Sequence, residues 1–167
     1  MAGGFTIDLT PLKVAQEVVK SIEFRREVSR AGAQAAVQQV DLAFRTGGSH
    51  YGDPWEPRST STAKALSARK RKKNGKLGKA RTPKPLLVDT GTLRKSFFVS
   101  HAGGDAFSVA TPVPYAKYHE YSTSKMPARP VMPIDAAGNP RGAKVETAIK
   151  RAMEARVNQL IDELSRK

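Results

Sequence analysis

Two long stretches of the chain carry apolar residues at intervals of three and four, the spacing of an amphipathic helix. The first predicts a helix over 11–45, with Thr10 as its cap and Pro11 at its first position. Gly32 is a point at which this helix could bend or divide. Its alanine-rich middle has little apolar bulk, so we expect it to pack closely against another backbone, either in this chain or in a neighbouring subunit.

The second helical stretch covers 141–165, and its apolar stripe is expected to pack on a sheet while charged residues face solvent. The stripe consists of Val145, Ile149, Met153 (or Ala152), Val157, Leu160, Ile161 and Leu164. Near the start of the chain, residues 4–9 alternate apolar and polar side chains, which predicts a short strand or an extended arm.

The stretch 86–135, between the two helices, has the densest succession of turn and strand signals. After the apolar run 86–88, Asp89 or Thr90 is expected to cap a short helix that ends near Ser96. Strands are predicted over 97–101 and 106–110, joined by a turn at Gly103-Gly104, with Phe107 and Val109 on one face of the second strand.

Prolines organise the rest of this stretch. Pro112 and Pro114 stop the second strand, and 115–119 then predicts a short helix whose aromatic rings point at the sheet. Pro127, Pro130 and Pro133 frame an edge strand around 131–134.

Together these elements predict one α+β domain over 1–167. Its small antiparallel sheet, made of the hairpin and edge strands in 86–135, is packed by the long N-terminal helix and the C-terminal helix. A long basic loop is expected over 59–85, and its first part, 59–73, could form a short helix. Only 39% of the residues are hydrophobic, so the core should be modest and parts of the surface completed by partners.

Charge adds the strongest global signal, because 29 Lys and Arg face 15 Asp and Glu, for a net charge of +14. Such a field attracts polyanions. The charge is concentrated in 64–84, which contains no acidic residue. The candidate contact residues there are Arg69, Lys70, Arg71, Lys72, Lys73, Lys76, Lys79 and Arg81.

Three interpretations of this basic segment remain open: a solvated loop, contact with an acidic protein neighbour, or contact with nucleic-acid phosphates. No aromatic residue lies among the cations, so stacking on bases is not expected, and any contact with DNA would be to its backbone.

Signals for catalysis and for cofactors are weak. The chain has no cysteine, which excludes disulfides, thiolate metal sites and cysteine nucleophiles. His50, His101 and His119 are far apart in sequence, and only His119 has an adjacent carboxylate, so neither a metal site nor a general-base pair is indicated. We therefore expect no enzyme activity and no cofactor.

Targeting signals are also weak. No apolar run approaches the ~20 residues of a membrane span, and the first ten residues lack the pattern of a secretory signal.

Trp55, the one tryptophan, has two interpretations. It can anchor the surrounding loop to the core, or it can make a contact between subunits, where tryptophan is enriched.

The order of the motifs resembles the phage virion morphogenesis family, the head–tail connector and tail-completion proteins of tailed phages. Gly52-Asp53-Pro54-Trp55 is followed by Glu56-Pro57, a Lys-rich spacer, LLVDTGTLRKSF, a hairpin, YAKYHE and PARPVMP. Tyr121-Ser122 stands where the family commonly has a glycine. The residues that match the motifs are Trp55, Asp89, Thr90, Gly91, Leu93, Tyr115, His119, Pro127, Arg129 and Pro130.

The resemblance implies a structural subunit of the virion at the head–tail junction, assembled in the host cytoplasm. It implies a homo-oligomeric ring around the DNA channel, with a hexamer favoured over a dodecamer. The implied partners are other copies of the chain, neighbouring neck, portal-side or tail-tube proteins, and the genomic DNA in the channel. The motif residues would build the core and one subunit face. The alternative function is a non-catalytic, sequence-independent nucleic-acid-binding module that uses 64–84 without any ring.

Overall fold

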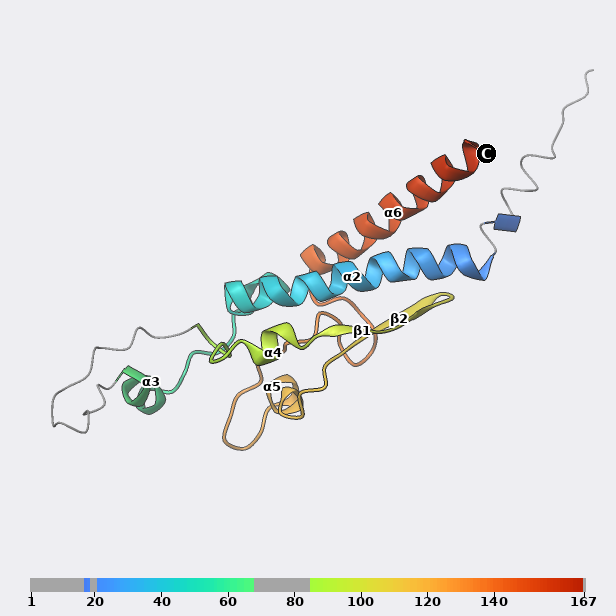
Figure 1. Ribbon diagram of the computed structural model, residues 1–167. Coiled ribbons are helices and arrows are strands. Elements are labelled where there is room, and N and C mark those ends of the chain that lie inside the picture. The colour runs from blue at the N-terminus through green and yellow to red at the C-terminus, as the bar shows by residue number, and fades with distance from the viewer. Residues whose placement is uncertain (1–16, 19–20, 68–84, 167) are drawn as a thin grey trace, which may run out of the picture.

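Three layers make up most of the molecule (Figure 1). The computed structural model describes residues 17–18, 21–67 and 85–166. The long helix α2 lies in the middle, with the C-terminal helix α6 on one side and the β1–β2 hairpin on the other. The elements are α2 (Ile22–Thr46), the 3-10 turn η1 (Ser49–Tyr51), α3 (Thr60–Ser67), α4 (Thr92–Lys95), β1 (Phe98–Gly103), β2 (Ala106–Ala110), α5 (Ala116–Tyr121) and α6 (Ala143–Ser165). The predicted α+β class, with two long helices packed against an antiparallel hairpin, is confirmed.

The predicted N-terminal helix is broken at Ser21, and α2 begins at the next residue. Ser21 has extended backbone angles (φ −63°, ψ 145°), and its hydroxyl accepts a hydrogen bond from the Phe24 N–H at 3.1 Å. A serine that caps a helix in this way cannot also continue one, so the predicted unbroken helix over 11–45 is interrupted at Ser21. The expected start at Thr10-Pro11 and the predicted arm over 4–9 lie outside the described residues. At Gly32 the helix continues without interruption.

The alanine-rich middle of α2 finds its close neighbours inside this chain. Ala33, Ala36 and Ala43 have no exposed surface. At Gly32, an added Cβ would lie 3.0 Å from the Met153 side chain and 3.3 Å from the Phe107 ring. Small residues therefore let α2 pass between α6 and the hairpin at close range, and this packing needs no neighbouring subunit.

The hairpin agrees with its prediction except at the turn. Strand β2 has the predicted bounds, with Val109 buried and Phe107 packed against the core. Strand β1 runs to Gly103, so the turn falls at Gly104-Asp105, where Gly104 has a φ of +56°. The turn is held against α2, because the Ser29 hydroxyl donates to the Gly104 carbonyl at 2.8 Å.

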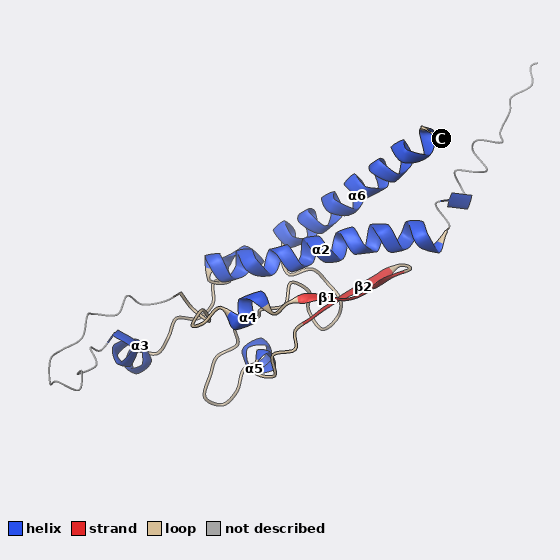
Figure 2. Ribbon diagram, in the orientation of Figure 1, coloured by secondary structure: helices blue, strands red, loops and turns tan. Residues whose placement is uncertain are grey.

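The sheet is smaller than predicted. Among the described residues only β1 and β2 form a sheet (Figure 2). The predicted edge strand at 131–134 is wrong, since the segment is irregular apart from an isolated bridge between Ile134 and Pro140. Val131 is nevertheless fully buried in the core, together with Phe44, Val40 and Val145.

Helix α6 begins two residues later than predicted and ends at the predicted residue, Ser165, but its stripe is only half covered. Val145 and Ile149 are buried, whereas Ile161 and Leu164 near the C-terminal end are 46% and 40% exposed. Helix α3 confirms a short helix in the first part of 59–73, and the rest of that range lies outside the described residues.

Candidate functional site

The motif residues converge on one packed unit. Trp55 is buried, and its indole N–H donates to the Pro130 carbonyl at 2.9 Å, so the first motif contacts the last one across 75 residues. Its ring also packs edge-on against Phe44 at 5.3 Å between centroids. At Gly48, which has a φ of +89°, an added Cβ would lie 2.3 Å from the Trp55 ring, so only glycine fits there. In this chain Trp55 therefore anchors the core.

Arg129 connects three of the motifs. Its side chain is buried, and its guanidinium donates to two carbonyls, of Glu56 at 2.8 Å and of Pro57 at 3.2 Å. Its own backbone N–H donates to the His119 carbonyl at 2.7 Å. The Glu-Pro step, the end of α5 and the Pro-Ala-Arg-Pro segment are thus held together by the side chain and backbone of one residue.

Glu120 is the buried acid that sequence reasoning missed. One oxygen of its carboxylate accepts hydrogen bonds from the backbone N–H groups of Val131 at 2.8 Å and Met132 at 3.0 Å, and the other pairs with Arg141. These bonds occupy donors that the predicted edge strand would have offered to a neighbouring strand, which accounts for its absence. The only sequence signal was an acid one position after His119 in a short helix.

Tyr51 completes this cluster from the other side. Its hydroxyl donates to the Val131 carbonyl at 3.1 Å. Burial, followed by the Glu120 carboxylate, raises the pKa of the Tyr51 phenol far above its usual value. The folded chain therefore favours the neutral phenol, which donates this hydrogen bond.

The turn before α4 differs in detail from its prediction. Gly91, with a φ of +82°, occupies the cap position, so neither Asp89 nor Thr90 is the N-cap of α4. The Thr90 hydroxyl still accepts from the Thr92 N–H at 3.3 Å. Leu93 is buried in the core. Asp89 is exposed but still interacts with the rest of the chain.

The next residue of α4, Arg94, attaches this turn to α2 by an ion pair with Asp41. The hydrogen bond from Arg94 lowers the pKa of the Asp41 carboxyl.

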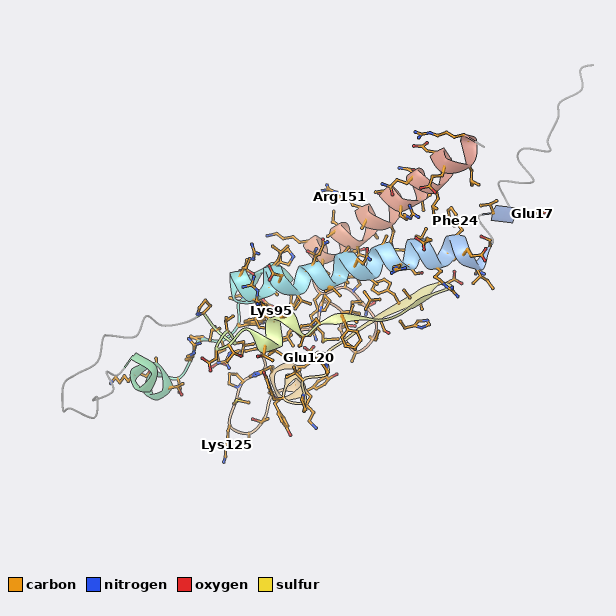
Figure 3. The ribbon with its side chains drawn as sticks, viewed as in Figure 1. Glu17, Phe24, Lys95, Glu120, Lys125 and Arg151 are labelled. Carbon is orange, nitrogen blue, oxygen red and sulfur yellow. The ribbon has the colours of Figure 1, made fainter. Side chains whose placement is uncertain are left out.

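The tyrosine rings at α5 face outward, contrary to the prediction, whereas the His119 ring is half buried. Tyr115, Tyr118 and Tyr121 are 44%, 45% and 69% exposed, while Ala116 and Glu120 are buried. The predicted inward face is wrong because the inner side of α5 carries the carboxylate that the 131–132 backbone requires. Figure 3 shows Glu120 directed into the packed region and Lys125 projecting away from it.

His119 and Pro127 lie at the margin of this unit. Burial, followed by the nearby Arg129 charge, lowers the pKa of the half-buried His119 imidazole. Pro127 is half buried in the loop that connects α5 to Arg129. Among the residues with described positions, no three His, Asp or Glu side chains gather closely enough to hold a metal ion.

The eight basic contact candidates, Arg69 to Arg81, lie outside the described residues. The structure therefore neither brings them together nor separates them. Within the described ranges, no helix combines the length and the hydrophobicity that a membrane span requires.

Comparison with known proteins agrees with the motif order. The model of the phage virion morphogenesis family matches residues 7–154, which include every motif residue described above. Among curated proteins and among solved structures, no match to this chain is found. On the strength of that match over most of its length, the chain belongs to the phage virion morphogenesis family.

Proposed function

We propose that this protein is a structural subunit of the phage neck, which assembles into a ring around the DNA channel and completes the tail or joins it to the head. A hexamer is the favoured ring. The proposal is supported by family membership and by one feature of the structure, the outward display of Tyr115, the N-cap residue of α5, and of Tyr118 and Tyr121 in that helix. Tyrosine is enriched in protein interfaces, because it combines a large apolar ring with a hydroxyl that can reach a partner.

The backbone beneath these tyrosines is fixed before any partner arrives. Glu120 holds the inner side of α5 to the 131–132 backbone, and the Arg129 N–H holds its last turn through the His119 carbonyl. A surface that is already ordered loses little conformational entropy on binding, which favours tight association. Lys117 lies 5.2 Å from the Tyr118 ring centroid and adds a positive charge to the same face.

The test is complementation of a phage that lacks its own copy of this protein. We expect the double substitution Tyr118→Ser with Tyr121→Ser to leave unjoined heads and tails and to lower the infectious titre at least about tenfold. The variant with Phe at both positions is the matched control, since it keeps the apolar rings. A normal titre with the serine variant would contradict the role of α5. Particle images that place the protein away from the neck, or in no ring, would contradict the proposed location.

The alternative, a nucleic-acid-binding module without a ring, is favoured by one observation. Every charged residue in 64–84 is Lys or Arg. A stable monomer that binds duplex DNA at physiological salt, with an affinity that falls steeply as salt rises, would support this alternative. Charge reversal of Arg69 to Lys73 is expected to block the joining of heads to tails under the ring proposal while leaving the fold intact.

A further inference from the structure

A groove opens where α2 and α6 diverge, at the end of the molecule where α2 begins and α6 ends (Figure 1). Its volume is about 570 Å³. The lining comes from the start of α2, the residues before it and the last turns of α6, and it consists of Glu17, Val18, Ser21, Glu23, Phe24, Glu27, Leu160, Glu163 and Leu164. Figure 3 shows Glu17 and Phe24 at this end.

The floor of the groove is apolar and incompletely covered. Phe24 is buried, but Leu164 is 40% exposed and the neighbouring Ile22 is 61% exposed. This is the half of the α6 stripe that the described part of the chain leaves partly exposed, because the two helices diverge there. Apolar area of this kind favours an occupant that brings apolar side chains of its own.

The rim of the groove is acidic. Four of its lining residues are glutamates, and none is Lys or Arg. Arg156, which lies just outside the lining, pairs with Glu27 at 3.1 Å and with Glu163 at 3.5 Å. Glu23 has no ion pair among the described residues, so the rim keeps an excess of negative charge.

The complementary chemistry lies in the same chain. Residues 64–84 contain only positive charges, and Leu77, between Lys76 and Lys79, is the one large apolar residue in 68–84. An apolar side chain flanked by cations matches an apolar floor with a carboxylate rim. Charge complementarity of this kind favours the correct partner and speeds the encounter, while the negative rim repels a nucleic acid from the groove itself.

The described residues that flank 68–84 lie far from the groove. Helix α3 is at one end of the molecule, and the start of α2 and the end of α6, which line the groove, are at the other (Figure 1). A contact between the basic segment of one copy and the groove of another therefore joins two different faces. Such head-to-tail contacts close into rings when the rotation between copies allows it.

We propose that the α2–α6 groove binds the basic segment, residues 64–84, of a second copy of this chain. This inference rests on the proposed ring and names the contact that builds it. The segment would lie along the acidic rim, with Leu77 on the apolar floor.

A mixing experiment with two full-length variants tests the contact. The first variant reverses the groove by Glu23→Lys with Glu163→Lys. The second reverses the segment by changing Arg69, Lys70, Lys72 and Lys73 to Glu. Glu23 and Glu163 are exposed, and thermal melting followed by circular dichroism establishes that each variant is folded. The matched control, Glu146→Lys with Glu154→Lys, makes the same charge change on α6 outside the groove.

The expected result, followed by sedimentation velocity at low salt, is specific to a head-to-tail contact. The wild-type chain and the control associate, and each reversed variant alone stays monomeric. An equimolar mixture of the two variants associates again, because the intact segment of one meets the intact groove of the other and the two reversed surfaces also carry opposite charges. A labelled peptide of residues 64–84 should bind the groove variant at least about tenfold more weakly than the wild type.

Other outcomes overturn the contact. The proposed contact is wrong if the wild-type chain neither associates nor binds the peptide. It is also wrong if the mixture of the two variants stays monomeric. A groove variant that melts earlier but associates normally would assign the groove to the chain's own residues 1–16. A segment variant that loses only DNA binding would assign the segment to DNA.

The two proposals can fail separately. If the contact fails while head–tail joining still depends on Tyr118 and Tyr121, the neck role survives. If joining depends on neither surface, both proposals fail.

Discussion

The two helices that follow the hairpin bury opposite kinds of side chain. Helix α6 covers the core with Val145 and Ile149 and exposes its charges, while α5 buries Glu120 and exposes its tyrosines. The difference lies in what each helix packs against. Helix α6 packs against the side chains of α2, whereas α5 packs against an irregular backbone whose N–H groups need acceptors. The spacing of apolar residues therefore identifies the buried face of a helix only where that face packs against side chains. It fails where the face packs against backbone groups that need hydrogen-bond partners.

The largest effect is expected from Glu120→Ala. The substitution leaves two buried N–H groups and the Arg141 guanidinium without their acceptor, which should lower the free energy of unfolding by about 3–5 kcal/mol. Ile149→Ala in α6 should cost a similar amount, about 2–5 kcal/mol, through lost packing. Denaturant unfolding measures both. Glu120→Gln keeps one acceptor oxygen and should recover part of the loss.

The control for this pair is Glu154→Ala, an exposed acid on α6, with an expected change within about 0.5 kcal/mol. If Glu120→Ala cost no more than this control, the buried carboxylate would not be what holds α5 in place.

A smaller change, of opposite sign, is expected at the end of α5. Ser122 has a φ of +65° and a ψ of 173°, a region of backbone space that only glycine adopts without strain. Ser122 is also one of the two residues, Tyr121-Ser122, at which the resemblance to the family led us to expect a glycine. Ser122→Gly should therefore raise the free energy of unfolding by about 1 kcal/mol. Ser124→Gly, in the same exposed loop, has no such strain to relieve and should not stabilise the fold.

His119 in α5 leads us to expect that the stability of the fold depends on pH. Burial lowers the pKa of His119, so the folded state favours the neutral imidazole. Stability is then complete above pH about 6.5, the ordinary pKa of histidine, and is lost as the pH falls through that value, because the unfolded chain takes up the proton first. His50 acts in the same direction, again through burial.

Melting temperatures measured between pH 7.5 and pH 5 should therefore decrease, and His119→Leu should make the decrease shallower. The same substitution at the exposed His101 on β1 is the control. A slope that His119→Leu leaves unchanged would show that the imidazole does not contribute.

The smallest effect on stability is expected on the outer side of α5. Tyr118→Ser should change the free energy of unfolding by no more than about 0.5 kcal/mol, because Tyr118 is 45% exposed and lies outside the core. The same substitution is part of the variant expected to disable particle assembly. A large loss of stability would mean that the tyrosine face supports the fold rather than a partner.

The sequence predicted those elements whose residues interact with near neighbours in a regular pattern. The bounds of β2 and the inner half of α6 follow from alternation and from helical spacing, and Trp55 was correctly offered as a core anchor. The missed features depend on contacts between distant residues. Neither the burial of Glu120 nor the absence of the edge strand at 131–134 can be predicted from neighbouring residues. The two features depend on each other, because the Glu120 carboxylate accepts hydrogen bonds from the 131–132 backbone. The break at Ser21 was missed because the apolar spacing continues through a residue that caps the helix.

One contact has a consequence for how this chain can vary. The Arg58 guanidinium donates to the Pro85 carbonyl at 2.7 Å, so the chain leaves the packed unit and re-enters it at the same place. The segment between Arg58 and Pro85 is therefore an insertion whose two ends are held together. Changing its length alters the free energy of the fold only slightly, by about 0.6 kcal/mol for each doubling. The length and charge of this insertion can therefore change while the packed unit beneath it stays the same.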